Sequence, residues 1–206
     1  MESLYVQFGC GLDAPVGWRN FDASSRLRAE KCPVIGRFIR PALFPKNCEY
    51  GDIVKGLPIP PTTCNVLYSS HVLEHLSLED LRTALQNAFA LLKPGGVFRA
   101  VVPDLERAAI NYVASEKEDR AITFLKGTSL GKVKRARGVM GWLREAIGNS
   151  SHLWMWDYRG LASELRSAGF DGIRQVRYGD SKDAMIDLVE NSERWHEAFG
   201  IHAIKP

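Results

Sequence analysis

The fold is decided by the stretch LYVQFGCGLDAPVGWRNFD, which runs from Leu4 to Asp22. Its first five residues are a short apolar run typical of a buried strand, and Gly9-Cys10-Gly11 follows as a tight turn. Trp18 to Asp22 is a second strand candidate. Only six residues, Leu12 to Gly17, separate the turn from this second run, whereas a parallel crossover ordinarily needs a dozen or more. The stretch therefore predicts two strands joined by an unusually short connection.

Short apolar runs alternate with helical patterns along the rest of the chain. The best helix begins at a capping box formed by Ser77 and Asp80 and carries one apolar stripe. The further predicted elements are strands at Cys48–Val54, Asn65–Ser69 and Val97–Val102, helices at Ser77–Lys93, Leu105–Lys117 and Arg159–Ala168, and two strand-like runs in the tail. Asp157 is the predicted cap of the last helix. This alternation indicates an α/β fold with a mainly parallel sheet.

Composition places the chain among globular proteins. It has 206 residues, of which 45% are hydrophobic and 25% charged, and a net charge of +3, so we expect one domain spanning residues 1–206. No apolar run approaches the roughly 20 residues of a membrane span, and the N-terminus lacks the layout of a signal peptide. The four cysteines are widely spaced, which predicts reduced thiols and a cytoplasmic location.

The glycine turn and the end of the second strand are the candidate ligand site, because open α/β sheets bind ligands beyond the carboxyl ends of their strands. Gly9 and Gly11 allow the backbone to approach a ligand closely, and Asp22 can accept both hydroxyls of a ribose. A plain turn and a cap before Ser24 are the alternatives. A dinucleotide motif needs a third glycine where Ala14 stands, and it needs a phosphate-binding helix that the short connection barely accommodates. These features favour S-adenosylmethionine over a nicotinamide.

Five segments stand in the order seen in class I S-adenosylmethionine-dependent methyltransferases: VQFGCGLDAPVGWRNFDAS, GDIVKGLPIP, LYSSHVLEHL, LLKPGGVFRAVVPDLE and HLWMWDYRGLASELRSAGF. The chain most resembles small members with a shortened first crossover, which are often associated with bacterial polysaccharide synthesis. The resemblance runs from Leu4 to Phe170, and GIHAIKP is similar to the family's last strand. It implies a Rossmann-like fold, with a mainly parallel seven-stranded sheet, helices on both faces and an antiparallel last strand.

The resemblance also implies which residues bind the cofactor. The turn Gly9-Cys10-Gly11 would approach the methionine part, and Asp22 would bind the ribose. Asp52 stands where the family places an acidic residue near the adenine. Ser70 and His71 would line the floor beside the transferred methyl group.

The segment His71-x-x-Glu74-His75 has the spelling of an inverted zinc peptidase motif. On a helix, His71 and His75 would lie on one face at the spacing of zinc ligands. However, the strand NVLYSS runs directly into the motif, and a peptidase would need a third ligand from elsewhere. We therefore assign it no metal and expect Glu74 and His75 to hold the turn through hydrogen bonds.

The acceptor side is predicted from the chemistry of methyl transfer, in which the protein mainly aligns the nucleophile with the methyl group. A sugar hydroxyl also has to lose a proton, for which histidine is the usual base. His152 is the first candidate and His71 the second, and Asp104 could bind an acceptor hydroxyl. The three aromatic residues after His152 could pack against a sugar. The alternatives are an aromatic core cluster that fixes His152 and a helix cap at Asp104.

A basic, glycine-rich segment at about residues 120–150 reads as a lid-like insert. It contains six basic residues and no acidic one between Lys126 and Arg144: Lys126, Lys132, Lys134, Arg135, Arg137 and Arg144. Such a segment could attract a phosphorylated acceptor, make peripheral contact with an anionic membrane, or contact RNA. A solvated loop is the alternative.

The sequence thus predicts a methyltransferase that uses S-adenosylmethionine and acts on a hydroxyl of a saccharide or saccharide-linked intermediate. The acceptor would be a small molecule or a glycan. One alternative is a cofactor-binding but catalytically degenerate partner domain, because Gln7 and Asp13 depart from the family's first motif. Another is an RNA methyltransferase, which is disfavoured because the basic residues are not interleaved with aromatic ones.

Overall fold

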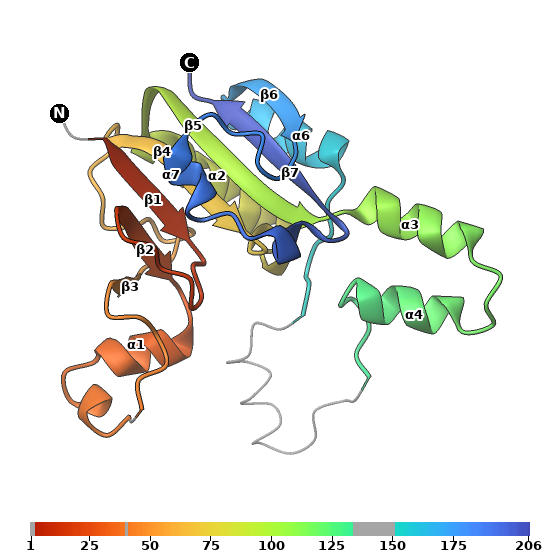
Figure 1. Ribbon diagram of the computed structural model, residues 1–206, viewed down its shortest axis with the longest axis horizontal. Coiled ribbons are helices and arrows are strands. Elements are labelled where there is room, and N and C mark those ends of the chain that lie inside the picture. The colour runs from red at the N-terminus through yellow and green to blue at the C-terminus, as the bar shows by residue number, and fades with distance from the viewer. Residues whose placement is uncertain (1–2, 40, 134–150) are drawn as a thin grey trace.

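The computed structural model describes residues 3–39, 41–133 and 151–206, which form a seven-stranded sheet (Figure 1). The strands are β1 (Leu4–Phe8), β2 (Trp18–Asp22), β3 (Cys48–Tyr50), β4 (Cys64–Ser70), β5 (Leu92–Pro103), β6 (Asp171–Val176) and β7 (Ala198–Ile204). Their order is β3-β2-β1-β4-β5-β7-β6, and only β7 runs antiparallel to its neighbours. The predicted fold class is confirmed, including the antiparallel last strand.

Helices cover both faces of this sheet, with α2 behind it and α7 in front of it in Figure 1. The α-helices are α1 (Ser25–Lys31), α2 (Leu78–Leu91), α3 (Leu105–Ala114), α4 (Arg120–Gly127), α6 (Tyr158–Ser167) and α7 (Ala184–Asp187). Short 3-10 helices are η1 (Ile35–Arg37), η2 (Leu73–His75) and η3 (Ser192–Trp195). The predicted caps are present: Ser77 accepts from the Asp80 amide at 3.1 Å and Asp157 from the Gly160 amide at 2.6 Å.

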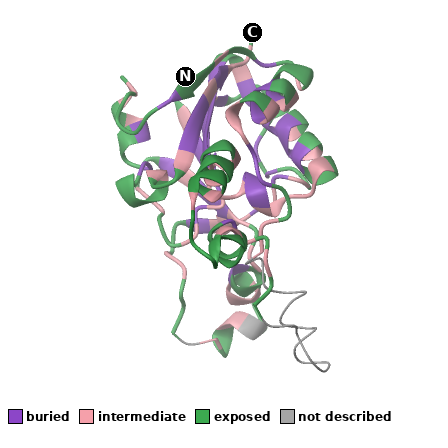
Figure 2. Cartoon of the chain, turned by 90° about the vertical axis from the view of Figure 1, so that its right-hand side faces the viewer, coloured by how far each residue is buried: buried purple, intermediate pink, exposed green. Residues whose placement is uncertain are grey.

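Figure 2 shows that buried residues are concentrated along the sheet and the helices packed on it. Alternation along the strands divides this core between the two faces of the sheet. In β4, Leu67 packs with the leucines of α2 and α6, whereas Val66 and Tyr68 pack on the opposite face with Trp18. Because these strands are buried on both faces, their sequences are continuous apolar runs, as is usual for parallel sheets.

The connection between β1 and β2 contains turns but no helix. The face beside it is covered instead by the segment around α7. Trp18 donates its indole N–H to the Met185 carbonyl at 2.9 Å, and Trp18, Ile186 and Val189 share one buried cluster. A late segment of the chain thus covers the face that the short connection leaves open.

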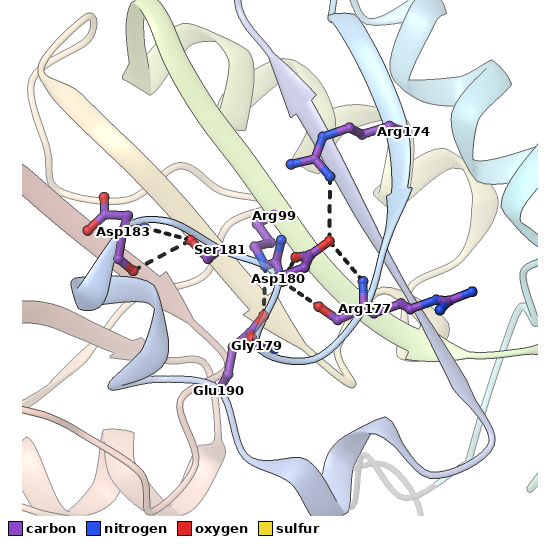
Figure 3. A network of polar contacts seen from close by, with 8 residues as sticks. All are labelled: Arg99, Arg174, Arg177, Gly179, Asp180, Ser181, Asp183 and Glu190. Atoms are coloured by element: carbon purple, nitrogen blue, oxygen red, sulfur yellow. Dashed lines mark hydrogen bonds and ion pairs between the residues drawn. The ribbon is translucent and has the colours of Figure 1, made fainter.

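A buried ion cluster anchors this covering segment to the sheet (Figure 3). Arg99 lies in the middle of β5 with a side chain only 1% exposed. Its Nε donates to Glu190 at 2.7 Å, and its terminal nitrogen donates to Asp180 at 2.9 Å and to the Arg177 carbonyl at 3.1 Å. The guanidinium also lies 5.6 Å from the centre of the Trp195 ring. The cluster therefore joins β5 to the chain between β6 and β7.

Several predicted elements differ from the structure at their ends. β5 begins at Leu92, five residues before the predicted start at Val97. β3 stops at Tyr50 instead of Val54, because the Asp52 carboxylate accepts from the Val54 amide and starts a turn. The helix predicted at Leu105–Lys117 ends at Ala114. The helix predicted to end at Lys93 is α2, which ends two residues earlier at Leu91.

The lid-like insert is only partly described. Lys126 lies in the last turn of α4 and Lys132 lies shortly after the helix, while the other four basic residues fall outside the described residues. α3 and α4 extend away from the sheet beyond the end of β5 (Figure 1). Within residues 3–39, 41–133 and 151–206, no helix has the length and apolar character needed to cross a bilayer.

The buried ion cluster predicts an asymmetry between two arginines. Arg99→Met leaves the buried Glu190 carboxylate without its cation and should lower the free energy of unfolding by about 3–5 kcal/mol. Arg82→Met removes a surface ion pair with Glu164 (2.9 Å) and should cost less than about 1 kcal/mol. Urea unfolding of both variants measures the difference, and equal losses would contradict the anchoring role.

Candidate functional site

The two glycines of the turn after β1 have different surroundings. Gly9 has a φ of +67°, and a Cβ at this position would overlap Val72 Cγ2. Gly11 has a φ of +55°, and a Cβ there would meet no other atom within 4 Å. Gly9 is therefore required by packing, whereas Gly11 borders an open space that a ligand can enter.

Asp22 lies directly against this turn. Its Oδ2 accepts a hydrogen bond from the Gly11 amide at 3.0 Å, and its Oδ1 accepts from the Ser24 amide at 2.8 Å. The cap of α1 is Ser24, which accepts from the Leu27 amide at 3.2 Å, so Asp22 is not the helix cap. Each carboxylate oxygen has a second lone pair, so Asp22 retains acceptor capacity for ribose hydroxyls.

Gln7 holds the same turn from below. Its side-chain amide donates to the Asp13 carbonyl at 2.7 Å and to the Asn20 side chain at 2.6 Å, and Gln7 is only 4% exposed. Gln7 stands where the family often has an acidic residue. In this chain the position has a structural role that the sequence did not reveal.

Cys10 turns its side chain away from the open space. Its thiol is buried against Leu27 and Cys48, with the two sulfurs 3.1 Å apart. The hydrogen bond with Cys48, together with burial, raises the pKa of the Cys10 thiol. Any contact between Cys10 and a ligand is therefore made by the backbone.

The other two predicted cofactor positions lie at the ends of β3 and β4. Asp52 closes its own turn and lies 3.2 Å from the Lys55 ammonium. The Ser70 hydroxyl is buried and forms no hydrogen bond with the residues that the structure describes. Ser70 thus offers an unused polar atom at the carboxyl edge of the sheet.

His71 follows Ser70 in a left-handed conformation, with a φ of +53°. Its Nε2 lies 2.7 Å from the Arg194 carbonyl, and its Nδ1 lies 3.3 Å from Glu74 Oε1. Burial works to lower the pKa of His71, but the interactions with Glu74 and the Arg194 carbonyl outweigh it, so that the pKa is raised. Because both ring nitrogens face acceptors, the surroundings favour a protonated ring.

A cleft of about 390 Å³ lies beyond the carboxyl ends of β4 and β5. Its wall includes all three predicted catalytic residues, His71, Asp104 and His152. The glycine turn, Asp22, Asp52 and Ser70 do not line it, so His71 is the predicted residue that connects the cofactor positions with the cleft.

Asp104 has a structural role at this wall. Its Oδ1 accepts from the Arg107 amide at 3.1 Å and caps α3. The alternative of a helix cap is thus observed, although the side chain still reaches the cleft.

His152 lines the cleft, and its surroundings involve Glu74, Met155 and the Thr128 carbonyl. Its Nδ1 lies 3.3 Å from the Met155 sulfur, and its Nε2 lies 4.0 Å from Glu74 Oε1. Burial lowers the pKa of His152, which favours the neutral ring with a lone pair.

The aromatic residues after His152 are mostly part of the core. Trp156 is 5% exposed, and Tyr158 packs against the same buried cluster. Only Trp154, which is 43% exposed, presents a surface to solvent. None of the three rings lines the cleft, so the expected aromatic platform for a sugar is not observed there.

The His71-x-x-Glu74-His75 segment does not form one α-helix. His71 ends the strand region, and Leu73–His75 form the 3-10 helix η2, so the junction expected from the sequence is confirmed. The structure also brings Glu74 and His75 to His152, with one ligand atom of each residue within 4.8 Å of the others. This approach could not be predicted from the sequence, because His152 lies far along the chain.

Comparison with known proteins agrees with this architecture. A family model described as a methyltransferase domain matches residues 13–175, whereas no curated protein sequence matches the chain. The solved structure of a possible histamine N-methyltransferase from Thermotoga maritima, described as S-adenosylmethionine-dependent, is 15% identical with a TM-score of 0.56, and the match covers 100% of this chain and 84% of that one.

Two further solved structures are similar in fold. An S-adenosylmethionine-dependent methyltransferase from Archaeoglobus fulgidus is 13% identical with a TM-score of 0.52, and the match covers 98% of this chain and 86% of that one. A putative methyltransferase from Haloferax volcanii, in complex with the Trm112 methyltransferase activator, is 15% identical with a TM-score of 0.51, covering 99% and 83%. Likeness at these identities concerns the fold alone.

The two glycines of the turn should respond differently to the same substitution. Gly9→Ala adds an overlap with Val72 to the strain of a positive φ, whereas Gly11→Ala adds only the strain, about 1–2 kcal/mol. Thermal unfolding should therefore show a clearly larger fall in Tm for Gly9→Ala. A Gly11→Ala variant that is the less stable of the two would contradict the assigned geometry.

Proposed function

The chain belongs to the methyltransferase domain family, whose cofactor is S-adenosylmethionine, and we propose that it methylates a hydroxyl group of a saccharide or saccharide-linked intermediate. The hydrogen bond between the Gly11 amide and Asp22 carries this proposal, because it joins the two positions that an adenosine without phosphate requires. The cleft beside them supplies groups for an acceptor.

The residues present fit this cofactor. Gly11 leaves the space that a side chain would fill, and Asp22 keeps lone pairs for the ribose. We assign the methionine part to the backbone of the glycine turn, the adenine side to Asp52, and the floor to Ser70 and His71. The bound cofactor supplies a methyl carbon that a sulfonium activates. The chain's own task is then to align the acceptor oxygen with that carbon.

We assign the acceptor hydroxyl to the cleft side of His152. The His152 Nε2 is not engaged by Met155, and its lone pair can take the hydroxyl proton. His71 is held by two acceptors, so it suits orienting the acceptor better than removing its proton. Asp104 can accept a hydrogen bond from a second hydroxyl.

The charges around the cleft favour an anionic acceptor. Arg107, Lys117 and Arg120 line it, whereas Asp104 and Glu197 are its acidic residues. This excess of cations would suit the phosphate of a nucleotide-linked or otherwise phosphorylated saccharide.

The cofactor assignment is tested by the affinity for S-adenosylhomocysteine. Asp22→Ala removes a charged acceptor for the ribose and should weaken binding by about 10–100-fold, since such hydrogen bonds contribute about 1.5–3 kcal/mol. Asp13→Ala, an exposed aspartate in the same connection, is the matched control and should bind as the wild type does. Isothermal titration calorimetry measures both, and an unchanged affinity in Asp22→Ala would mean that the ribose contact is misassigned.

The acceptor assignment is tested by turnover. With methyl-labelled cofactor and a panel of free and nucleotide-linked sugars, His152→Ala should lose about 10²–10⁴-fold in rate and retain its affinity for S-adenosylhomocysteine. His202→Ala, which changes a histidine on β7 that does not line the cleft, is the control. An equal fall in Tm and in rate would identify His152 as a packing residue. Cofactor binding without turnover on any acceptor would favour the degenerate partner domain.

A further inference from the structure

Three side chains with metal-binding chemistry meet beside the cleft. Glu74 and His75 come from η2, and His152 comes from the segment before α6. One ligand atom from each lies within 4.8 Å of the other two, which is close enough for a single ion to reach all three. We propose that Glu74, His75 and His152 bind a divalent transition-metal ion of the Zn²⁺ type.

Glu74 gives the strongest reason for a bound cation. Its side chain is 1% exposed, and neither carboxylate oxygen forms a hydrogen bond with the residues that the structure describes. A buried carboxylate without compensation is costly by several kcal/mol, and native proteins pair such groups or use them to coordinate metals. The nearest cationic group is His71, whose Nδ1 is 3.3 Å from Oε1. This single contact compensates the carboxylate only in part, since neither oxygen accepts a hydrogen bond from the described residues.

Each of the two histidines has one ring nitrogen held by an outer partner. His75 Nδ1 lies 3.1 Å from the Ser151 carbonyl, and a carbonyl can only accept, so this nitrogen carries the proton and Nε2 carries the lone pair. His152 Nδ1 is engaged by the Met155 sulfur at 3.3 Å, and its Nε2 lies toward Glu74. Outer partners of this kind fix the tautomer and ring orientation of ligating histidines.

The backbone holds the three residues together independently of any ion. The amides of Leu153 and Trp154 both donate to the Glu74 carbonyl, at 2.8 and 3.1 Å. The rings of His75 and His152 meet edge to face, with 5.0 Å between their centres. The donor set is therefore preformed, and His71 is placed to support the Glu74 carboxylate as an outer partner.

This site differs from the peptidase reading of the same segment. That reading uses His71 and His75 as ligands, but His71 Nε2 is engaged by the Arg194 carbonyl. His152 takes its place. Two imidazoles and a carboxylate favour a transition metal over Mg²⁺, and three protein ligands leave a fourth position open on zinc.

The open position suggests a role, which rests on the proposed function. His152 lines the cleft, so an ion on its Nε2 could bind an acceptor hydroxyl from there. A metal ion lowers the pKa of a bound hydroxyl. The lone pair of His152 would then hold the ion, and the hydroxyl proton would pass to solvent water in the cleft.

The binding itself is tested on the full chain after chelator treatment and dialysis. Titration calorimetry with Zn²⁺ should show one equivalent bound, and Mg²⁺ should not compete. His75→Gln and His152→Gln should each weaken Zn²⁺ binding by at least about tenfold, while the control His196→Gln, exposed on the same cleft, should match the wild type. Co²⁺ in place of Zn²⁺ should give the visible absorption of a low-symmetry site, and that absorption should be lost in both ligand variants.

Two results would overturn the proposal: no Zn²⁺ binding by the wild type, or equal binding by the wild type and both ligand variants. Preference for Mg²⁺ would contradict the choice of ion. Thermal unfolding without metal checks that His75→Gln and His152→Gln remain folded; if either is unfolded, the wild-type titration and its Co²⁺ spectrum still decide. Titration with S-adenosylhomocysteine on the metal-free protein separates the two proposals, because retained cofactor binding without Zn²⁺ binding would reject the metal site alone.

Discussion

The hydrogen bond from the Gly11 amide to the Asp22 carboxylate, at 3.0 Å, is the constraint on which the candidate site depends. In a longer crossover, a helix would set the position of the turn after β1. Here the connection has no helix, so the turn is held by Asp22 on one side and by Gln7 from below. The same carboxylate thus positions the turn and remains available to a ligand. Gly9, packed against Val72, completes the constraint.

The short connection has a consequence for how the sheet face beside it is covered. A face of the sheet that it does not cover is covered by the segment around α7, and this segment is tied to β5 through Arg99. A buried ion cluster contributes little net stability compared with an apolar core. However, any packing of the segment that leaves one of these buried charges unpaired is strongly destabilised. We infer that Arg99 fixes where the covering segment lies.

Much of the fold could be predicted from the sequence, because strands and helix caps are local signals. The runs before Gly9 and after Asn65, and the caps at Ser77 and Asp157, all lie where the pattern places them. The partners of Arg99 and the approach of His152 to Glu74 could not be predicted, since both depend on contacts between distant segments. The expected length of β3 was wrong because the turn preference of Asp52 outweighed the apolar pattern after it.

The central claim is that Gly11 and Asp22 hold an adenosine at the carboxyl edge of the sheet, with the acceptor cleft on the far side of His71. A crystal structure of the protein with S-adenosylhomocysteine tests this most directly. The account predicts that the ribose hydroxyls lie on the Asp22 carboxylate, that the adenosine passes Gly11, and that the sulfur faces the cleft beside His71. Density for the ligand within the cleft itself, with the space at Gly11 empty, would contradict it.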